Sequence, residues 1–551
     1  MRDSKSSPGI STWRSTARPG VWSRHLFKTA TQCRGVIYHA RFRNQQGRNE
    51  LRPYIHLVIQ EIYAMSAEAA VKFVTETPSE EIERVKAWID TEEYKEKNFA
   101  RTALVVNPAH ACQPLGAQMV ATGFEGALPF VHGSQGCASY FRSTFSRHYR
   151  EPAAATCDAM TEDGAVFGGQ NNLFEGLENA YALYKPKMIP VYTTCMPEVI
   201  GDDLTAFIKN AKLQGHLPEE LPTPYANTPS FNGTHIHGYD AMLKSILETL
   251  TEGQKGAGTC IGKLNIIPGF DGNVGNLREY KRICELMGIP YTMLADVSDV
   301  FDSGCDGEYK LYPGGTRLED AAASINGKAT LSLQKYSTVN TMKWIESEYT
   351  GEKVLLPMPF GIRKTDELIL KLAELFDKPV PEVLKKERAL AVDAMTDAHQ
   401  YLHGRKFAIA GDPDYLLGIV SFLLEMGARP WHVLCSRATK KFQKEMDALL
   451  ASSPFGAGCT CYINKDLWHL RSLLVTDPVD GIIGDTHAKW AARDAGIPLF
   501  RIGFPIIDRV NLHRTPVVGY NGAISMLSMI ANKFLEIKDE TCEDQWFEMM
   551  R

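Results

Sequence analysis

Residues 107–140 read NPAHACQPLGAQMVATGFEGALPFVHGSQGCASY, and residues 193–198 add TTCMPE. Each of their three cysteines, Cys112, Cys137 and Cys195, lies at or beside a Gly or Pro where a hydrophobic run gives way to small residues. Such breaks can turn a side chain toward a fixed point, because Pro restricts the backbone and Gly frees it. The separations of 25 and 58 residues are too long for one zinc knuckle or one ferredoxin loop. Thiolates from three loops suit a large iron–sulfur cluster, although spacing alone leaves open that they are buried hydrophobic cysteines.

The length, composition, net charge and cysteine count limit the class of protein. A chain of 551 residues is long enough for about three domains. Its 44% hydrophobic and 23% charged content is typical of a soluble globular protein, and the net charge of −5 gives no sign of a nucleic-acid partner for the whole chain. No apolar run is long enough to predict a membrane span. Twelve cysteines are too sparse for a disulfide scaffold, so we expect a reducing, cytoplasmic location.

Apolar segments alternate with helical ones along most of the chain. Strands are expected at residues 128–133, 188–194, 264–269 (a strand and its turn), 290–294, 406–410, 431–435, 481–484 and 498–502. Helices are expected at residues 79–89, 276–287, 382–402, 414–426 and 487–495. This βαβ rhythm predicts an α/β fold of three Rossmann-like domains, with parallel sheets flanked by helices and sites at the carboxyl ends of the strands.

The predicted domain limits follow this rhythm. They are a basic extension (1–64), a helical arm (65–110), and three Rossmann-like domains (111–238, 239–395 and 396–551). The extension holds 11 Arg or Lys residues against three acidic ones. Such a composition is typical of an organelle transit peptide, but we favour translation that begins at Met65. Neither a G-x-G-x-x-G nor a G-x-x-x-x-G-K-[ST] motif is found, so we expect no nucleotide on this chain.

Several ordered motifs resemble one family. The segments at 107–117, 132–137 and 193–198, together with RHYREP at 147–152, MTEDGAVFGG at 160–169 and EVIGDD at 198–203, closely resemble the β subunits of nitrogenase molybdenum–iron proteins. The resemblance runs from about Met65 to the C-terminus.

This resemblance implies a role for the three cysteines. Cys112, Cys137 and Cys195 would ligate the P-cluster, an [8Fe–7S] centre shared with an α chain and lying between domains at the subunit interface. It also implies an α2β2 heterotetramer, an iron–molybdenum cofactor on the α chain, and transient, ATP-dependent binding of the iron protein. The chain would relay electrons for the reduction of N2 to ammonia. We expect no catalytic residue on it, because the chemistry belongs to the cofactor.

Further residues match family positions. Ser230 matches a serine whose oxygen can bind a cluster iron in the oxidised state, with a turn-forming serine as the alternative. Ser134 and Tyr140 match positions that line the cluster, where packing and tuning of the potential are both open. Phe167, beside Gly168-Gly169, matches an aromatic at the docking face for the iron protein, and its ring is expected on a mobile, poorly supported turn.

A possible divalent cation site is the last implied feature. Glu151, through its carboxylate, and Arg150, through its backbone carbonyl, match residues that bind a cation across the β–β contact. The other half is expected from the segment after Gly361, where Asp366 is a candidate. Arg363 stands there where some relatives have Asp, which weakens the match, and a solvated charge cluster is the alternative.

The resemblance is also compatible with other classes of protein. The main alternative is a paralogous scaffold on which the iron–molybdenum cofactor is assembled. A subunit related to dark-operative protochlorophyllide reductase, or one of a vanadium or iron-only nitrogenase, would share part of the pattern. The three cysteines with Ser230 and Phe167 favour the nitrogenase component.

Overall fold

The structure is a computed structural model that describes residues 79–104, 106–256, 262–305 and 307–543. The chain divides into two units, Met1–Ala87 and Trp88–Arg551. The first described helix, α3 (Ser79–Ile89), has the bounds predicted from the sequence, and α4 (Glu92–Phe99) follows it. The predicted extension, 1–64, lies outside the described residues.

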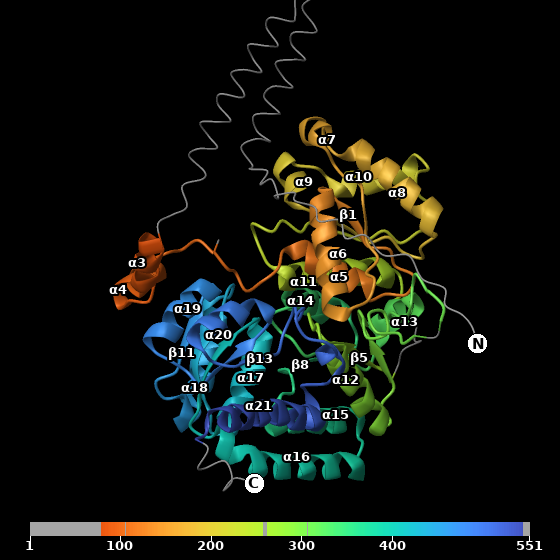
Figure 1. The fold of residues 1–551 in the computed structure, drawn as a ribbon. Helices are drawn as coiled ribbons and strands as arrows, with labels where there is room; N and C mark the ends of the chain where they lie inside the picture. The colour runs from red at the N-terminus through yellow and green to blue at the C-terminus, as the bar shows by residue number, and fades with distance from the viewer. Residues whose placement is uncertain (1–78, 105, 257–261, 306, 544–551) are drawn as a thin grey trace, which may run out of the picture. The chain divides into compact units, whose positions relative to one another are not determined.

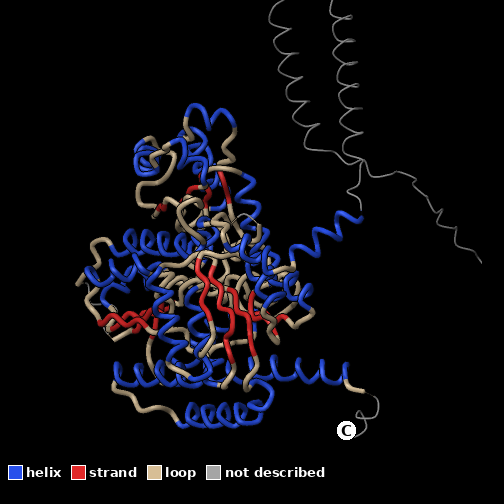
Figure 2. The backbone as a smooth tube through the Cα atoms, turned by 90° about the vertical axis from the view of Figure 1, so that its left-hand side faces the viewer, coloured by secondary structure: helices blue, strands red, loops and turns tan. Residues whose placement is uncertain are grey.

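Three parallel sheets form the framework of the second unit, with helices around them (Figures 1 and 2). The first sheet has the order β2-β1-β3-β4 and contains β1 (Phe130–His132), β2 (Thr156–Cys157), β3 (Val191–Thr193) and β4 (Tyr225–Ala226). Its helices are α5 (Gln113–Thr122), α6 (Gln135–Tyr149), α7 (Glu162–Phe167), α8 (Gln170–Tyr184), α9 (Cys195–Ile200), α10 (Leu204–Leu213) and α11 (His235–Thr251). Every residue of β1 and β3 is buried, as expected of strands with both faces covered.

The second sheet has the order β6-β5-β7-β8. Its strands are β5 (Leu264–Ile267), β6 (Tyr291–Met293), β7 (Ala329–Ser332) and β8 (Glu352–Leu355). The helices of this part are α12 (Val274–Leu286), α13 (Leu318–Ala323), η1 (Ser324–Asn326), α14 (Val339–Glu348) and α15 (Gly361–Phe376). The helix expected from residue 276 begins at Val274, because the Asn273 side chain accepts a hydrogen bond from the Gly275 N–H and caps it there.

The third sheet has the order β11-β10-β9-β12-β13. Its strands are β9 (Lys406–Ala410), β10 (Arg429–Cys435), β11 (Thr460–Ile463), β12 (Gly481–Gly484) and β13 (Leu499–Arg501). The helices are α16 (Glu382–Leu402), α17 (Pro413–Glu425), α18 (Lys440–Ala451), η2 (Pro454–Gly456), α19 (Leu467–Thr476), η3 (Thr486–Ala488), α20 (Lys489–Ala495), η4 (Leu512–Arg514) and α21 (Gly519–Thr541). The C-terminal helix α21 packs along α16 and α15 (Figure 1).

The predicted α/β class with three parallel sheets is therefore confirmed. The exact domain limits stay a prediction. The helix expected at 487–495 is divided, because Asp485 caps a short turn of 3-10 helix before α20 begins. Among the described residues, no helix combines the length and the apolar character that crossing a bilayer requires.

Candidate functional site

Cys112 lies at the N-terminus of α5, where it is the capping residue and partly exposed. Pro114 occupies the first turn of this helix, a position that Pro favours because its missing N–H would have no helical partner. The helix packs against α11 at very short range. A Cβ atom at Gly116 would overlap the carbonyl oxygen of His235, and one at Gly238 would overlap that of Gln113. The two glycines therefore let the helix backbones touch, which sets the position of Cys112.

Cys137 lies in the first turn of α6, after the β1 strand ends at His132. Ser134 is the capping residue of this helix, and its carbonyl oxygen accepts a hydrogen bond of 3.1 Å from the Cys137 N–H. Tyr140 lies one turn further along α6 and is 58% exposed, with its ring edge-on to Phe141 at 5.9 Å. Both Ser134 and Tyr140 thus share the helix that carries Cys137.

Cys195 is the first residue of α9 and is exposed. The preceding residue, Thr194, caps the helix and joins this loop to that of Cys137. Its Oγ1 accepts a hydrogen bond of 3.3 Å from the Ser134 N–H, and its own N–H donates to the His132 carbonyl at 3.0 Å. Gly133 lies directly against the Thr194 side chain, with no room for a Cβ atom. The Cys137 and Cys195 loops are therefore held together.

Ser230 lies in a turn that is tied to the other two segments. The turn is closed by the Asn232 N–H, which donates to the Pro229 carbonyl at 3.1 Å. The same carbonyl accepts a hydrogen bond of 2.6 Å from Nε2 of Gln113, the neighbour of Cys112. Thr228 donates through its N–H and its hydroxyl to Thr193, at 2.8 and 2.6 Å, two residues before Cys195. The structure thus brings together the segments of Cys112, Cys137, Cys195 and Ser230.

The thiol groups influence one another. Burial raises the pKa of Cys137, and the negative charges of Cys112 and Cys195 raise it further, while a hydrogen bond with Ser134 acts in the opposite direction. Such an effect requires charges at short range. Among the described residues, no three His, Cys, Asp or Glu side chains are close enough to hold a single metal ion. The three sulfurs are therefore neighbours, but they are spread too widely for a mononuclear site.

The helix N-termini at the cysteines were not predicted. Cys112 caps a helix, Cys195 begins one and Cys137 lies in the first turn of one, where the unpaired N–H groups and the helix dipole favour a negative charge such as a thiolate. A signal was present in two cases, because Pro114 and Pro197 each follow a cysteine by two residues, in the first turn of a helix.

Phe167 is the last residue of α7 and is 86% exposed. The expected mobile, poorly supported turn is instead the end of α7, a short helix that packs beside α9 (Figure 1). Val166 and Val199, which are 72% and 74% exposed, lie on the same two helices. These three exposed apolar side chains, on the helix that begins at Cys195 and on its neighbour, are together called the Phe167 surface below.

A buried histidine, which the sequence did not point out, lies between this surface and the cysteine loops. His132 Nδ1 donates to Asp158, and Nε2 donates to Asp202 at 3.1 Å. The side chains of His132, Asp158 and Asp202 are 0%, 0% and 5% exposed. Burial alone would lower the pKa of His132, but the hydrogen bonds and charges of the two aspartates outweigh it and raise the pKa to about 9. His132 is therefore a buried cation at neutral pH.

Replacing His132 with Asn is expected to change how stability depends on pH. The folded-state pKa of about 9 lies above the ordinary 6.5, so the stabilisation is complete below pH 6.5 and is lost as the pH rises through 9. Below pH 6.5 the wild type should have a larger free energy of unfolding than His132→Asn. As the pH rises through 9, this difference should shrink by roughly 3 kcal/mol at most.

Chemical unfolding at a series of pH values checks this expectation. His432→Asn is the matched control, because His432 is also a buried strand histidine, but burial lowers its pKa and it stays neutral throughout the window. Parallel pH profiles for the wild type and His132→Asn would contradict the prediction.

The predicted cation ligands have other partners in this chain. Asp366 accepts hydrogen bonds from the Arg388 guanidinium, at 2.9 and 3.0 Å, and from the Tyr520 hydroxyl. Arg150 is in the left-handed conformation (φ 64°), and its guanidinium donates to the Ile507 carbonyl at 2.9 Å. Hydrogen bonding to Asp302 raises the pKa of the Arg514 guanidinium, and the nearby charge of Glu151 raises it further. A cation site between two copies therefore stays a prediction.

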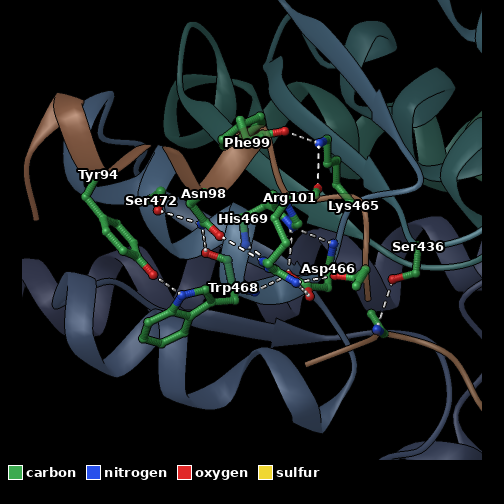
Figure 3. A network of polar contacts seen from close by, with 12 residues as sticks. Tyr94, Asn98, Phe99, Arg101, Ser436, Lys465, Asp466, Trp468, His469 and Ser472 are labelled. Carbon is green, nitrogen blue, oxygen red and sulfur yellow. Dashed lines mark hydrogen bonds and ion pairs between the residues drawn. The ribbon is translucent and has the colours of Figure 1, made fainter. Parts of the chain in front are cut away.

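The arm before Cys112 is held by hydrogen bonds to the helix α19 and its capping residue (Figure 3). Arg101 makes two hydrogen bonds, of 2.8 and 2.9 Å, to the fully buried Asp466 carboxylate, which also caps α19. Although burial acts in the opposite direction, hydrogen bonds from His469 and Arg101 hold the pKa of Asp466 far below its usual value. Asn98 donates to the Trp468 carbonyl at 3.1 Å. The chain thus enters the Cys112 loop from an anchored point.

Comparison with known proteins places these features in a family. A family model described as "Nitrogenase component 1 type Oxidoreductase" matches residues 112–535. A "Nitrogenase molybdenum-iron protein beta chain" from Nostoc sp. is 55% identical, covering 84% of this chain and 90% of its own length. The protein of that name from Azotobacter vinelandii is 47% identical, covering 87% and 94%. A solved structure titled "Nitrogenase Cp1 at pH 6.5" has 41% identity and a TM-score of 0.79, covering 82% of this chain and 98% of that chain. These matches do not favour the assembly-scaffold alternative.

Proposed function

Because this chain belongs to the family of nitrogenase component 1 type oxidoreductases, we propose that it holds part of a metal–sulfur cluster and relays electrons for the reduction of N2 to ammonia. In this role it is the β subunit of a molybdenum–iron protein and forms a complex with an α chain. The cluster is the [8Fe–7S] P-cluster, shared with that α chain, which carries the iron–molybdenum cofactor. Electrons come from an ATP-hydrolysing iron protein that binds transiently.

The residues present fit such a cluster. Cys112, Cys137 and Cys195 are free thiols on tied loops, and thiolates are the ligands that iron–sulfur clusters prefer. Burial raises the pKa of Cys137, and the nearby charges of Cys112 and Cys195 raise it further, so a bound cation would stabilise all three thiolates. Cys195 is exposed and the other two are partly exposed, so a second polypeptide can cover them. This convergence of three thiols at one surface is the observation that carries the proposal.

Each group of this chain has a defined task. When bound, an iron–sulfur cluster supplies one-electron transfer. The thiolates of Cys112, Cys137 and Cys195 bind the iron, and the helix N-termini stabilise their negative charge. Ser134, which already contacts Cys137, donates a hydrogen bond that tunes the site. Ser230, on the turn tied to the other loops, offers a hydroxyl oxygen as a further ligand.

Purification together with an α chain tests the proposal. We expect a complex of two chains of each kind, with several iron atoms per αβ pair and an EPR signal after oxidation. Iron content near zero in a well-folded complex would refute the cluster assignment. A complex that holds iron but passes no electrons to an acceptor would refute the relay.

Replacing Ser230 with Ala is expected to change the oxidised cluster and leave the reduced one intact. A serine oxygen is a harder ligand than a thiolate and favours the oxidised metal. A redox titration followed by EPR should therefore show a shifted midpoint for the most oxidised state. Ser303→Ala, at an exposed serine outside these loops, is the control, and identical titrations of both variants and the wild type would contradict a ligand role.

Replacing Phe167 with Ala is expected to weaken binding of the iron protein. Aromatic side chains at interface centres often contribute more than 2 kcal/mol, so the apparent KM for the iron protein should rise by about thirty-fold or more. Because Phe167 is 86% exposed and contributes little to packing, the EPR spectrum and iron content should not change. Leu370→Ala, an exposed apolar residue on α15, is the control. An unchanged KM in Phe167→Ala would argue against docking at this surface.

A further inference from the structure

A buried carboxylate connects the Phe167 surface to the helix that begins at Cys195. The Asp202 carboxylate accepts hydrogen bonds of 3.1 and 3.2 Å from the Gly169 N–H, two residues after Phe167. The N–H of Asp202 in turn donates to the Pro197 carbonyl at 3.0 Å, within α9. Since α9 is a single short helix from Cys195 to Ile200, a shift of Asp202 moves the backbone of Cys195.

The same carboxylate is joined to the Cys137 loop through His132. Asp202 accepts from His132 Nε2 at 3.1 Å, and His132 is the last residue of β1. The other ring nitrogen bonds Asp158, whose second oxygen accepts a hydrogen bond of 2.9 Å from the Gly133 N–H. One continuous chain of polar contacts therefore leads from Gly169 to the backbone just before the Cys137 helix.

The packing at this junction leaves no free space. A Cβ atom at Gly169 would lie 2.6 Å from His132 Cε1 and 2.7 Å from both Asp202 Oδ2 and Met160 Cε. Close-packed interiors transmit displacements, because neighbouring groups cannot move independently. Any movement of the Gly169 backbone is thus passed directly to His132 and Asp202.

We propose that Asp202 and His132 are positioning residues that couple partner binding at the Phe167 surface to the arrangement of the Cys137 and Cys195 loops. The inference rests on the proposed function and adds a defined route between two of its parts. A partner that presses on α7 and α9 displaces the Gly169 turn, and the two buried residues pass this displacement to both loops. Electron entry then depends on docking and not only on proximity.

Asp202→Asn tests the coupling, because it preserves size but removes the charge that faces His132. The matched control is Asp477→Asn, since Asp477 also lies beside a buried strand histidine, His432, in the third sheet. Both variants are compared with the wild type as the complete complex with its α chain. Four quantities are measured: iron content, apparent KM for the iron protein, electron transfer from the iron protein with MgATP, and reduction of the oxidised complex by dithionite.

We expect Asp202→Asn to keep its iron content and its KM within about two-fold, while electron transfer from the docked iron protein falls about ten-fold. Reduction by dithionite, which needs no docking, should match that of the wild type, and Asp477→Asn should match the wild type in all four. An equal loss by both routes, or no loss by either, would overturn the coupling.

A second variant covers the case in which Asp202→Asn fails to assemble. His132→Gln changes the same contact with Asp202 from the histidine side. The rate of reduction by the iron protein is again compared with the rate of reduction by dithionite. A wild-type complex without iron would instead overturn the proposed function itself, and this outcome is separate because it appears before any variant is made.

Discussion

Cys195→Ala is expected to abolish the cluster and, with it, electron relay. Cys195 begins α9 at a point that is tied through Thr194 to the Cys137 loop, so no other described thiol can take its place without moving this junction. Loss even of a group that only supports a metal ligand commonly reduces affinity 10- to 100-fold, by about 1–3 kcal/mol, and loss of the ligand itself should exceed this. Iron content, the EPR signal of the oxidised complex, and N2 reduction should all fall by about 100-fold or more.

Cys305→Ala is the matched control for this experiment. Cys305 is likewise a free and exposed cysteine, but it lies on the loop after β6, outside the four tied segments. Its replacement should leave iron content and activity at the wild-type level. Equal iron content in Cys195→Ala and Cys305→Ala would show that Cys195 is not a ligand.

Gly133→Ala is expected to have the second-largest effect, because this residue joins two of the cysteine loops. Gly133 has a φ of 138°, which L-residues rarely adopt, and an added Cβ atom would overlap Thr194 Oγ1. The backbone strain costs about 1–2 kcal/mol and the overpacking about 1–3 kcal/mol more. The Thr194 side chain must move to relieve this overlap, which breaks the hydrogen bond that joins the Cys137 and Cys195 loops. The complex should therefore lose most of its iron as well as stability.

Gly503→Ala separates the contact from the backbone strain. Gly503 has a similar φ of 111°, but an added Cβ atom would meet nothing within 4 Å. This variant should lose only the stability that the strain accounts for, about 1–2 kcal/mol, with normal iron content. Both variants are measured by chemical unfolding and iron analysis. If Gly133→Ala holds as much iron as Gly503→Ala, the Gly133 contact does not set the position of the cysteine loops.

Regular elements with a clear hydrophobic pattern were predictable from the sequence. The strands β9 and β12 and the helix α16 have the predicted bounds, because their apolar runs are flanked by distinct breaks. The strands β2 and β4, which are two residues long, were not predicted, since two residues carry no periodicity. They exist because neighbouring strands supply their hydrogen bonds.

Some residues of the candidate site were likewise predictable from the sequence, and others were not. Cys112, Cys137 and Cys195 were predicted as cluster ligands only through the family resemblance, because their spacing alone left open that they are buried hydrophobic cysteines. The buried His132 was not predicted, since a histidine at the end of an apolar run looks like an ordinary core residue. Its two aspartates lie 26 and 70 residues away along the chain, and only folding brings them to it.

Propensity and periodicity, which act within a few residues, were enough to predict the α/β rhythm, and the ordered motifs were enough to identify the family to which the chain belongs. Tertiary structure alone decided that the four segments with candidate cluster ligands meet. The contacts that join them, Ser134 with Thr194, Gln113 with Pro229 and Thr193 with Thr228, span 60, 116 and 35 residues. Such contacts form only when the packing of whole helices and strands outweighs the entropy of closing the intervening loops.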